Sequence, residues 1–207
     1  MAYDTKPKEQ AEAAELQPTF GRYAEIPYDQ MTPEQQEGYH ELLRSIGGEP
    51  GTQLPGPLKI WVNNPKLATA MGPITQHFSP PNDSLSEREH ELAVSIINSK
   101  WHTPYSINAH VERAEKLGLP ANMVEAAACG LPASFSDERE QVIYEIVTAL
   151  ANSRWVPKSL YDRAVKALGH VGITDVTVLM GYYTAVSLTL AFYDVPAGAT
   201  GMNMGDV

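Results

Sequence analysis

The sequence predicts an all-α protein, and three observations support that fold class. Apolar residues recur at helical spacing in one segment after another, these segments open at Ser, Thr or Pro, and no segment alternates with a period of two. The chain has 207 residues, 43% of them hydrophobic, which is enough for one substantial core. We expect a flexible arm at 1–21, a single helical domain at 22–197 and a flexible tail at 198–207.

The first half of the chain predicts four helices. A capping box at Thr32–Gln35 opens the first, and Gly47–Gly48 ends it. A loop rich in Gly and Pro follows at 51–57, and Ser86 caps the fourth helix. The expected helices of this half are 33–46, 58–62, 65–78 and 86–99.

The second half predicts five more helices, because helix-opening residues recur at regular intervals. Thr103 supplies a capping oxygen before Pro104, Pro120 opens the next helix, and Ser136 caps the one after it. Gly172 leads into a long segment that is uncharged from 176 to 193. The expected helices are 103–117, 120–129, 136–152, 157–168 and 172–193.

Charge and cysteine content exclude several classes of protein. The net charge of -10 and the pI near 5.0 argue against nucleic-acid or anionic-membrane partners, which need a basic surface. A single cysteine, Cys129, excludes an internal disulfide or CxxC pair, so we expect a reducing, cytoplasmic setting. The uncharged stretch 176–193 carries too many hydroxyls for a lipid-facing span, so we expect it in the core or at a subunit contact.

Two titratable residues fall on adjacent apolar-faced helices. Glu91 lies on the helix that Ser86 opens, and His110 lies on the next, one short bend later. Ser106 and Ile107 share a helical face with His110. A carboxylate and an imidazole brought together in a dry groove can move a proton, so we place the chemistry there.

A weak internal repeat appears when the chain is shifted by fifty positions. It suggests two helical hairpins of similar build, of which only the first carries groups that titrate near neutral pH. The matching pairs are Ser86/Ser136, Arg113/Arg163, Ala114/Ala164 and Lys116/Lys166, whereas Glu91 falls opposite Gln141 and His110 opposite Leu160.

From about Arg22 to Pro196 the chain resembles the carboxymuconolactone decarboxylase proteins of the alkylhydroperoxidase D-like superfamily. The segments that carry the resemblance are L-P-G-P-L-K-I-W-V-N-N-P at 54–65, L-S-E-R-E-H-E-L at 85–92, 105–110, A-E-K-L-G-L-P at 114–120 and G-Y-Y-T-A-V-S-L-T-L at 181–190. The resemblance implies an all-helical oligomer, which we expect to be a homotrimer or homohexamer.

Two departures from that superfamily bear on the chemistry. Thr103 and Ser106 stand where peroxidase-type relatives have two cysteines, so thiol peroxidase activity is excluded. Other relatives carry a Y-E-W-x-x-H segment, and here Tyr105 and His110 match while Ser106 and Ile107 replace the carboxylate and the tryptophan. Any reaction that needs an acidic group at position 106 is therefore in question.

The resemblance implies a cofactor-free lyase that acts on a small anionic lactone. Glu91 and His110 correspond to the glutamate and histidine of the superfamily's proton relay, and the amides at the Thr103 helix start could hold the anion. We expect no metal. The residues expected to bind substrate are Trp101, His102, Thr103, Tyr105 and Ser106.

Several alternatives stay open at the level of sequence. The chain could be a non-catalytic oligomer that binds a small ligand or partner. It could be a metal-dependent oxygenase or hydrolase, with Glu91, His102 and His110 as ligands. Ser106 could be a nucleophile activated by His110. The residues given a purely structural role are His40, His77, His90, His170 and Cys129, the last as a small buried residue.

Overall fold

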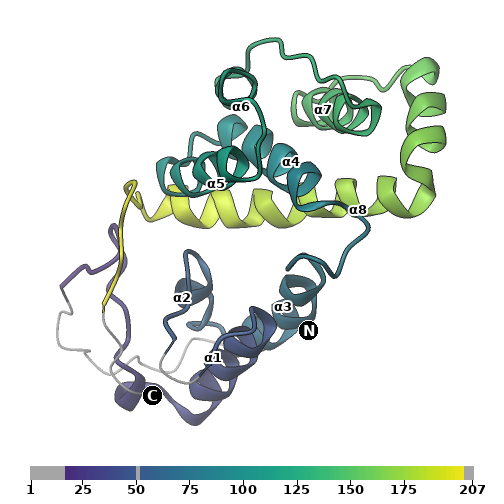
Figure 1. Ribbon diagram of the computed structural model, residues 1–207. Coiled ribbons are helices and arrows are strands. Elements are labelled where there is room, and N and C mark those ends of the chain that lie inside the picture. Colours follow the sequence, from purple (N-terminus) through teal and green to yellow (C-terminus); the bar gives the residue numbers. More distant parts are fainter. Residues whose placement is uncertain (1–16, 50–51, 203–207) are drawn as a thin grey trace, which may run out of the picture.

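The computed structural model describes residues 17–49 and 52–202, and this part of the chain is all-helical, as predicted (Figure 1). Each expected helix is present, with ends within a few residues of those predicted. The elements are the 3-10 helix η1 (Tyr28–Gln30) and the α-helices α1 (Pro33–Ser45), α2 (Leu58–Trp61), α3 (Pro65–His77), α4 (Glu87–Lys100), α5 (Pro104–Lys116), α6 (Ala121–Ala128), α7 (Glu138–Ala151) and α8 (Lys158–Phe192).

Two of the predicted helix caps are confirmed by the structure, and two others are wrong. Capping boxes form at Thr32 and Ser86, as predicted. Helix α7 is capped by Asp137 rather than Ser136, because the Asp137 carboxylate accepts two backbone N–H groups. The Thr103 side chain does not cap α5, because its hydroxyl lies against Asn98 O and Ser187 Oγ instead.

Helix α8 is two helices joined by a sharp bend. Gly169 adopts φ 64° and ψ 177°, a left-handed conformation that glycine enters without steric cost. Among the described residues, α8 is the one helix long and apolar enough to cross a membrane, a property that core helices of soluble proteins share. Here it packs against α4 and α7. The predicted separation of 157–168 from the uncharged segment is confirmed.

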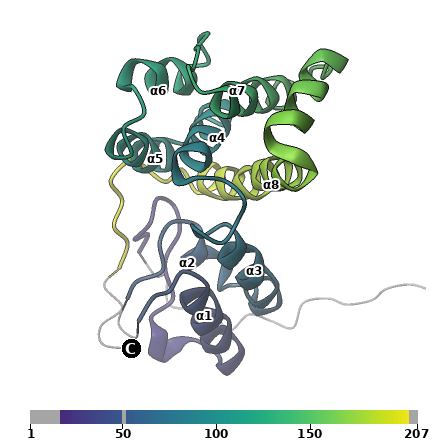
Figure 2. The same ribbon diagram turned by 45° about the vertical axis from the view of Figure 1, so that its right-hand side comes forward.

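The helices form two lobes, and the second part of α8 runs between them (Figures 1 and 2). Helices α4 to α7 lie on one side of it and α1 to α3 on the other. Each lobe has its own hydrophobic cluster, and Tyr182 and Tyr183 pack against both clusters. His77 of α3 also contacts Asp175 of α8, with 2.9 Å between Nε2 and Oδ1.

Helices α4 and α7 exchange ion pairs about a local pseudo-twofold relation. Arg88 Nε lies 2.7 Å from Glu140 Oε1, and Arg139 Nε lies 2.6 Å from Glu89 Oε1. The segment S-E-R-E at 86–89 therefore corresponds to D-E-R-E at 137–140, a shift of 51 rather than fifty. In this register Glu91 corresponds to the apolar Val142, so the carboxylate is still confined to the first hairpin.

The two ends of the described chain are held in the fold. Phe20 is fully buried, although it belongs to the predicted flexible arm, and the Arg22 amide donates to Tyr193 O. In the predicted flexible tail, Thr200 O accepts a hydrogen bond from Lys59 Nζ. The rest of the predicted arm (1–16) and tail (203–207) lies outside the described residues.

Candidate active site

Glu91 and His110 form a buried dyad between α4 and α5. Nδ1 of His110 lies 2.6 Å from Oε2 of Glu91, and both side chains are less than a tenth exposed. Because a carboxylate only accepts hydrogen bonds, Nδ1 carries the proton. Nε2 of His110 has no hydrogen-bond partner among the described residues, and it is not sealed in the core. That nitrogen is therefore available to a ligand.

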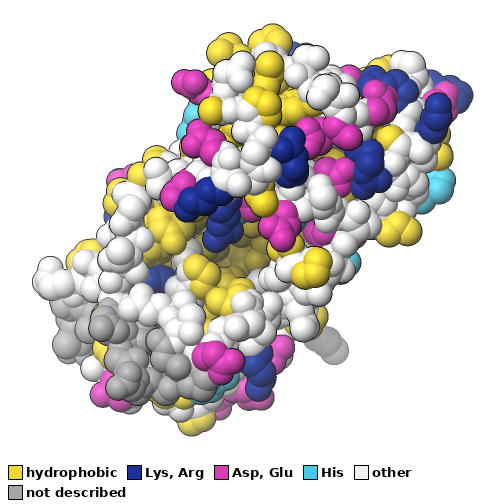
Figure 3. All heavy atoms as spheres, viewed as in Figure 1, with side chains coloured by type: hydrophobic (Ala, Val, Ile, Leu, Met, Phe, Trp, Pro, Cys, Tyr) yellow, Lys and Arg dark blue, Asp and Glu magenta, His cyan; other side chains and the backbone are white. Residues whose placement is uncertain are grey.

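The dyad lies at the wall of a cavity of about 410 Å³ between the two lobes. This volume suits a small organic molecule. Figure 3 shows the hollow between the lobes, with hydrophobic side chains inside it and Lys or Arg side chains at its border. The polar residues of the lining include His90, Glu91, Tyr105, Ser106, His110 and Arg113, and the apolar residues include Ile46, Leu58, Phe78, Val186 and Leu190.

The electrostatic surroundings of His110 oppose its protonation in the empty cavity. Burial lowers the pKa of His110, because the imidazolium form loses its hydration. The neighbouring Arg113 and His90 act in the same direction, whereas the contact with Glu91 acts against it. His110 is thus mainly neutral near pH 7, with a lone pair on Nε2.

Arg113 is a cation at the rim of the cavity, one helical turn after His110. Its Nη1 is 4.0 Å from Oε1 of Glu91, and its side chain is 62% exposed. No shorter contact to a carboxylate is present among the described residues, so most of the donors of the guanidinium are available. Arg113 can therefore meet a negatively charged group entering the cavity.

Tyr183 lies against His110 and His90, with 5.1 Å and 5.9 Å between the ring centroids. Burial raises the pKa of the Tyr183 phenol far above its ordinary value, and the nearby Tyr182, Glu91 and Asp83 add to this effect. The phenol is thus a neutral hydrogen-bond donor at every working pH. A donor of this kind stabilises negative charge that develops on a bound oxygen.

The residues predicted to bind substrate divide into two groups. Tyr105 and Ser106 line the cavity, and Tyr105 Oη also accepts the Gly56 amide at 3.2 Å. Trp101, His102 and Thr103 do not line it: Trp101 Nε1 contacts Thr184, His102 lines a separate cavity, and the Thr103 hydroxyl is buried against α8. The bend at 101–103 turns away from the dyad, which sequence spacing did not show.

Two alternative chemistries lack the geometry they require. Because His102 lies on a separate cavity, Glu91, His102 and His110 do not form a common metal site, and no cluster of three such ligands occurs among the described residues. Ser106 and His110 share no hydrogen bond in the described structure, so a serine nucleophile activated by His110 is not assembled. Cys129 is exposed rather than buried, and lines the separate cavity.

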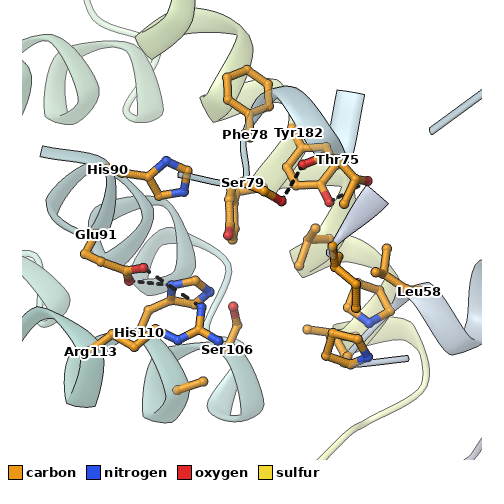
Figure 4. Close-up of a pocket in the computed structure, with 18 of the residues that line it drawn as sticks. Leu58, Thr75, Phe78, Ser79, His90, Glu91, Ser106, His110, Arg113 and Tyr182 are labelled. Atoms are coloured by element: carbon orange, nitrogen blue, oxygen red, sulfur yellow. Dashed lines mark hydrogen bonds and ion pairs between the residues drawn. The ribbon is translucent and has the colours of Figure 1, made fainter. Parts of the chain in front are cut away.

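Sequence reasoning missed three residues of the site. His90 was given a structural role, yet it lines the cavity beside Glu91 (Figure 4). Arg113 was noted only in the internal repeat, although its spacing of three from His110 already placed it on the same helical face. Tyr183 lay in a segment quoted only for the resemblance, and its position depends on α8 passing between the lobes.

Comparison with known proteins supports the fold and leaves the family open. No family model matches this chain, and no curated protein matches it. Among solved structures, the apo debrominase Bmp8 matches with a TM-score of 0.59 and 15% identity, over 81% of this chain and 87% of that one. A cysteine-to-alanine variant of Bmp8 in complex with 2,3,4-tribromopyrrole matches with a TM-score of 0.56 and 17% identity, over the same shares. The chain therefore has the all-helical, alkylhydroperoxidase D-like fold that its sequence predicted.

Proposed function

We propose that this protein is a cofactor-free lyase resembling carboxymuconolactone decarboxylase, which removes carbon dioxide from a small carboxylated lactone or related ring. The observation that carries the proposal is the Glu91–His110 dyad at the wall of a cavity of about 410 Å³. The likeness to an enzyme of the same fold is compatible with it. Debromination by a cavity thiol is not proposed, because the chain's single cysteine, Cys129, lies on a separate cavity.

The proposed reaction needs one bond broken and one proton delivered. The bond between the ring carbon and the carboxylate breaks, carbon dioxide leaves, and the electron pair delocalises into the unsaturated lactone as a dienolate. Tyr183 lines the cavity, and its phenol would donate a hydrogen bond to the enolate oxygen. His110, protonated on Nε2, gives its proton to carbon, and Glu91 stabilises the imidazolium form through Nδ1.

A pH profile is the first test of the proton donor. The protonated fraction of His110 in the free enzyme falls as pH rises through its pKa, which burial holds below the ordinary 6.5. We therefore expect kcat/KM to fall with rising pH, with a midpoint below 6.5. A bound anion favours the imidazolium, so kcat should fall at a higher pH than kcat/KM does. Steady-state rates from pH 4.5 to 9 would show this separation, and equal midpoints would contradict it.

The reaction itself is tested with a carboxylated, unsaturated γ-lactone in D2O. We expect the protein, purified and assayed in the presence of a chelator, to release one carbon dioxide per turnover and to place one deuterium on carbon. Gas release and NMR of the product measure the two quantities. Absence of conversion across a panel of such lactones would overturn the lyase and leave the non-catalytic ligand-binding oligomer as the better description.

Arg113 should contribute to binding more than to chemistry. Its guanidinium lies at the exposed rim, where it attracts an anionic substrate without contacting the reacting carbon. We expect Arg113→Gln to raise KM about tenfold, the loss of one exposed charge-assisted contact, and to change kcat less than threefold. Arg44→Gln, which removes an exposed cation on α1, is the control. An unchanged KM would show that Arg113 does not contact the substrate.

We also propose that copies of this chain associate through the exposed face of α8. From 171 to 192 the only charged residue is Asp175, which points inward. The outward residues recur with the three- and four-residue spacing of a helix–helix seam. They are Val171, Thr174, Val178, Gly181, Ala185, Leu188 and Phe192, of which Phe192 is 75% exposed.

Light scattering tests this association. We expect a mass of three or six chains, and we expect Val178→Glu to reduce it because the substitution buries a charge in the seam. Leu131→Glu alters an apolar side chain outside α8 that is at least as exposed as Val178 and should leave the mass unchanged. A wild-type mass of one chain would contradict the proposal.

A further inference from the structure

A second histidine–carboxylate pair borders the cavity through its histidine. Nδ1 of His90 lies 3.2 Å from Oδ2 of Asp83, and their side chains are 2% and 0% exposed. Asp83 also accepts the Leu85 amide through Oδ1, which fixes the carboxylate at the start of α4. His90 is next to Glu91 in the sequence, and its side chain lines the same cavity (Figure 4).

The two pairs share the same arrangement of donor and acceptor, although the contact of His90 with Asp83 is longer, at 3.2 Å against 2.6 Å. In each, a buried carboxylate holds Nδ1, so Nδ1 carries a proton and Nε2 is left for another partner. Neither Nε2 atom has a hydrogen-bond partner among the described residues, and neither is enclosed in the core. Both histidines line the cavity, so a ligand inside it has two imidazoles within its surroundings.

Tyr183 connects the two pairs in space. Its ring packs edge-on against both imidazoles, with interplanar angles of 86° to His110 and 82° to His90. Its phenol is close enough to Glu91 and Asp83 for both carboxylates to raise its pKa. The cavity thus combines two proton-transfer groups with a neutral donor that stays protonated.

We propose that His90, oriented by Asp83, is a second catalytic residue, and that the cavity also isomerises β,γ-unsaturated lactones to their conjugated isomers. The inference rests on the proposed function, because both reactions pass through a dienolate in the same cavity. The isomerisation differs from the lyase reaction because its substrate needs no carboxylate on the ring.

In the isomerisation the lactone loses one proton from its α-carbon and gains one proton at its γ-carbon, so the reaction balances. Nε2 of His110 takes the proton from the α-carbon, and the electron pair of that C–H bond delocalises onto the lactone oxygen, where Tyr183 donates a hydrogen bond. His90 acts as the imidazolium, in which Nδ1 donates to Asp83 and Nε2 carries the second proton. It gives that second proton to the γ-carbon, and the double bond moves into conjugation. The neutral form of His110, favoured by burial, is the form that can act as the base. Exchange with solvent returns both imidazoles to their starting forms.

The test uses a β,γ-unsaturated γ-butenolide without a carboxylate, in D2O. We expect the wild type to form the conjugated isomer with deuterium at the γ-carbon in every turnover, since the two protons belong to different residues. His90→Gln should lower this rate by at least about a hundredfold, the usual contribution of a general acid. Return of the original proton to the γ-carbon, or a wild-type rate in His90→Gln, would overturn the proposal.

Two further variants complete the design. Asp83→Asn keeps the imidazole but removes the charge that orients it, so a smaller loss of rate and a shifted pH profile are expected. If His90→Gln does not fold, a wild-type rate and pH profile in Asp83→Asn would overturn the proposal. His77→Gln removes a carboxylate-bound imidazole outside the cavity and should stay within about twofold of wild type, the range of ordinary surface substitutions.

The lyase and isomerase activities can be separated by the choice of substrate. A butenolide without a carboxylate cannot lose carbon dioxide, so the isomerisation assay does not depend on decarboxylation. Release of carbon dioxide from a carboxylated lactone, together with no isomerisation of the butenolide, would remove the role of His90 and leave the lyase. Isomerisation that depends on both histidines, with no decarboxylation of any lactone, would remove the lyase and keep the two-imidazole site.

Discussion

Replacing His110 with glutamine should lower turnover of a carboxylated lactone by about 10²–10⁴-fold, the contribution expected of a positioned general acid. Glutamine has a similar reach and can still hydrogen-bond Glu91, but it has no group that gives up a proton in this pH range. Substrate affinity should change much less, since Arg113 and the apolar wall stay in place. Steady-state kinetics separate the two effects.

The matched control for His110→Gln is His77→Gln. His77 also contacts a carboxylate, with 2.9 Å between its Nε2 and Asp175 Oδ1, but neither residue lines the cavity. Circular dichroism and light scattering should show that both variants keep the helicity and the mass of the wild type. Full turnover in His110→Gln, or an equal loss in both variants, would contradict a role of His110 in proton transfer.

The helices could be predicted from the sequence because their signals are local. A capping box such as Thr32–Gln35, or a glycine such as Gly47, acts on residues within one turn, and a single sequence contains all of that information. One of the two cap errors arose where two neighbouring residues offered the same cap. Ser136 and Asp137 both suit the start of α7, and the packing of Arg139 and Glu140 against α4 selects Asp137.

The site could be predicted only in part, for a physical reason. Glu91 and His110 lie on consecutive helices joined by a short bend, so their proximity follows from the hairpin. The contact of His90 with Asp83 depends on the path of the loop before α4, and Tyr183 reaches the dyad only because α8 passes between the lobes. Such contacts depend on tertiary packing, for which spacing along the chain gives no signal.

A second large effect is expected far from the cavity, at the buried ion pair of Glu25 and Lys59. Nζ of Lys59 lies 3.1 Å from Oε1 of Glu25, in an ion pair whose geometry is not that of a hydrogen bond. The side chain of Lys59 is 6% exposed and that of Glu25 is 2% exposed. Lys59 Nζ also lies 4.7 Å from the centroid of the Phe20 ring. Lys59→Met should lower the free energy of unfolding by about 3–5 kcal/mol, because it leaves the Glu25 carboxylate buried without its counterion.

Urea unfolding of three variants distinguishes this cause from a loss of packing. Lys158→Met breaks an exposed pair with Asp162 and should cost less than about 1 kcal/mol. The double variant Glu25→Gln with Lys59→Met has no charge left at this buried position. It should therefore recover at least half of the unfolding free energy that Lys59→Met loses. An equal loss in the double and single variants would mean that Lys59 stabilises the fold through its contacts with Phe20 and Thr200, and not by neutralising Glu25.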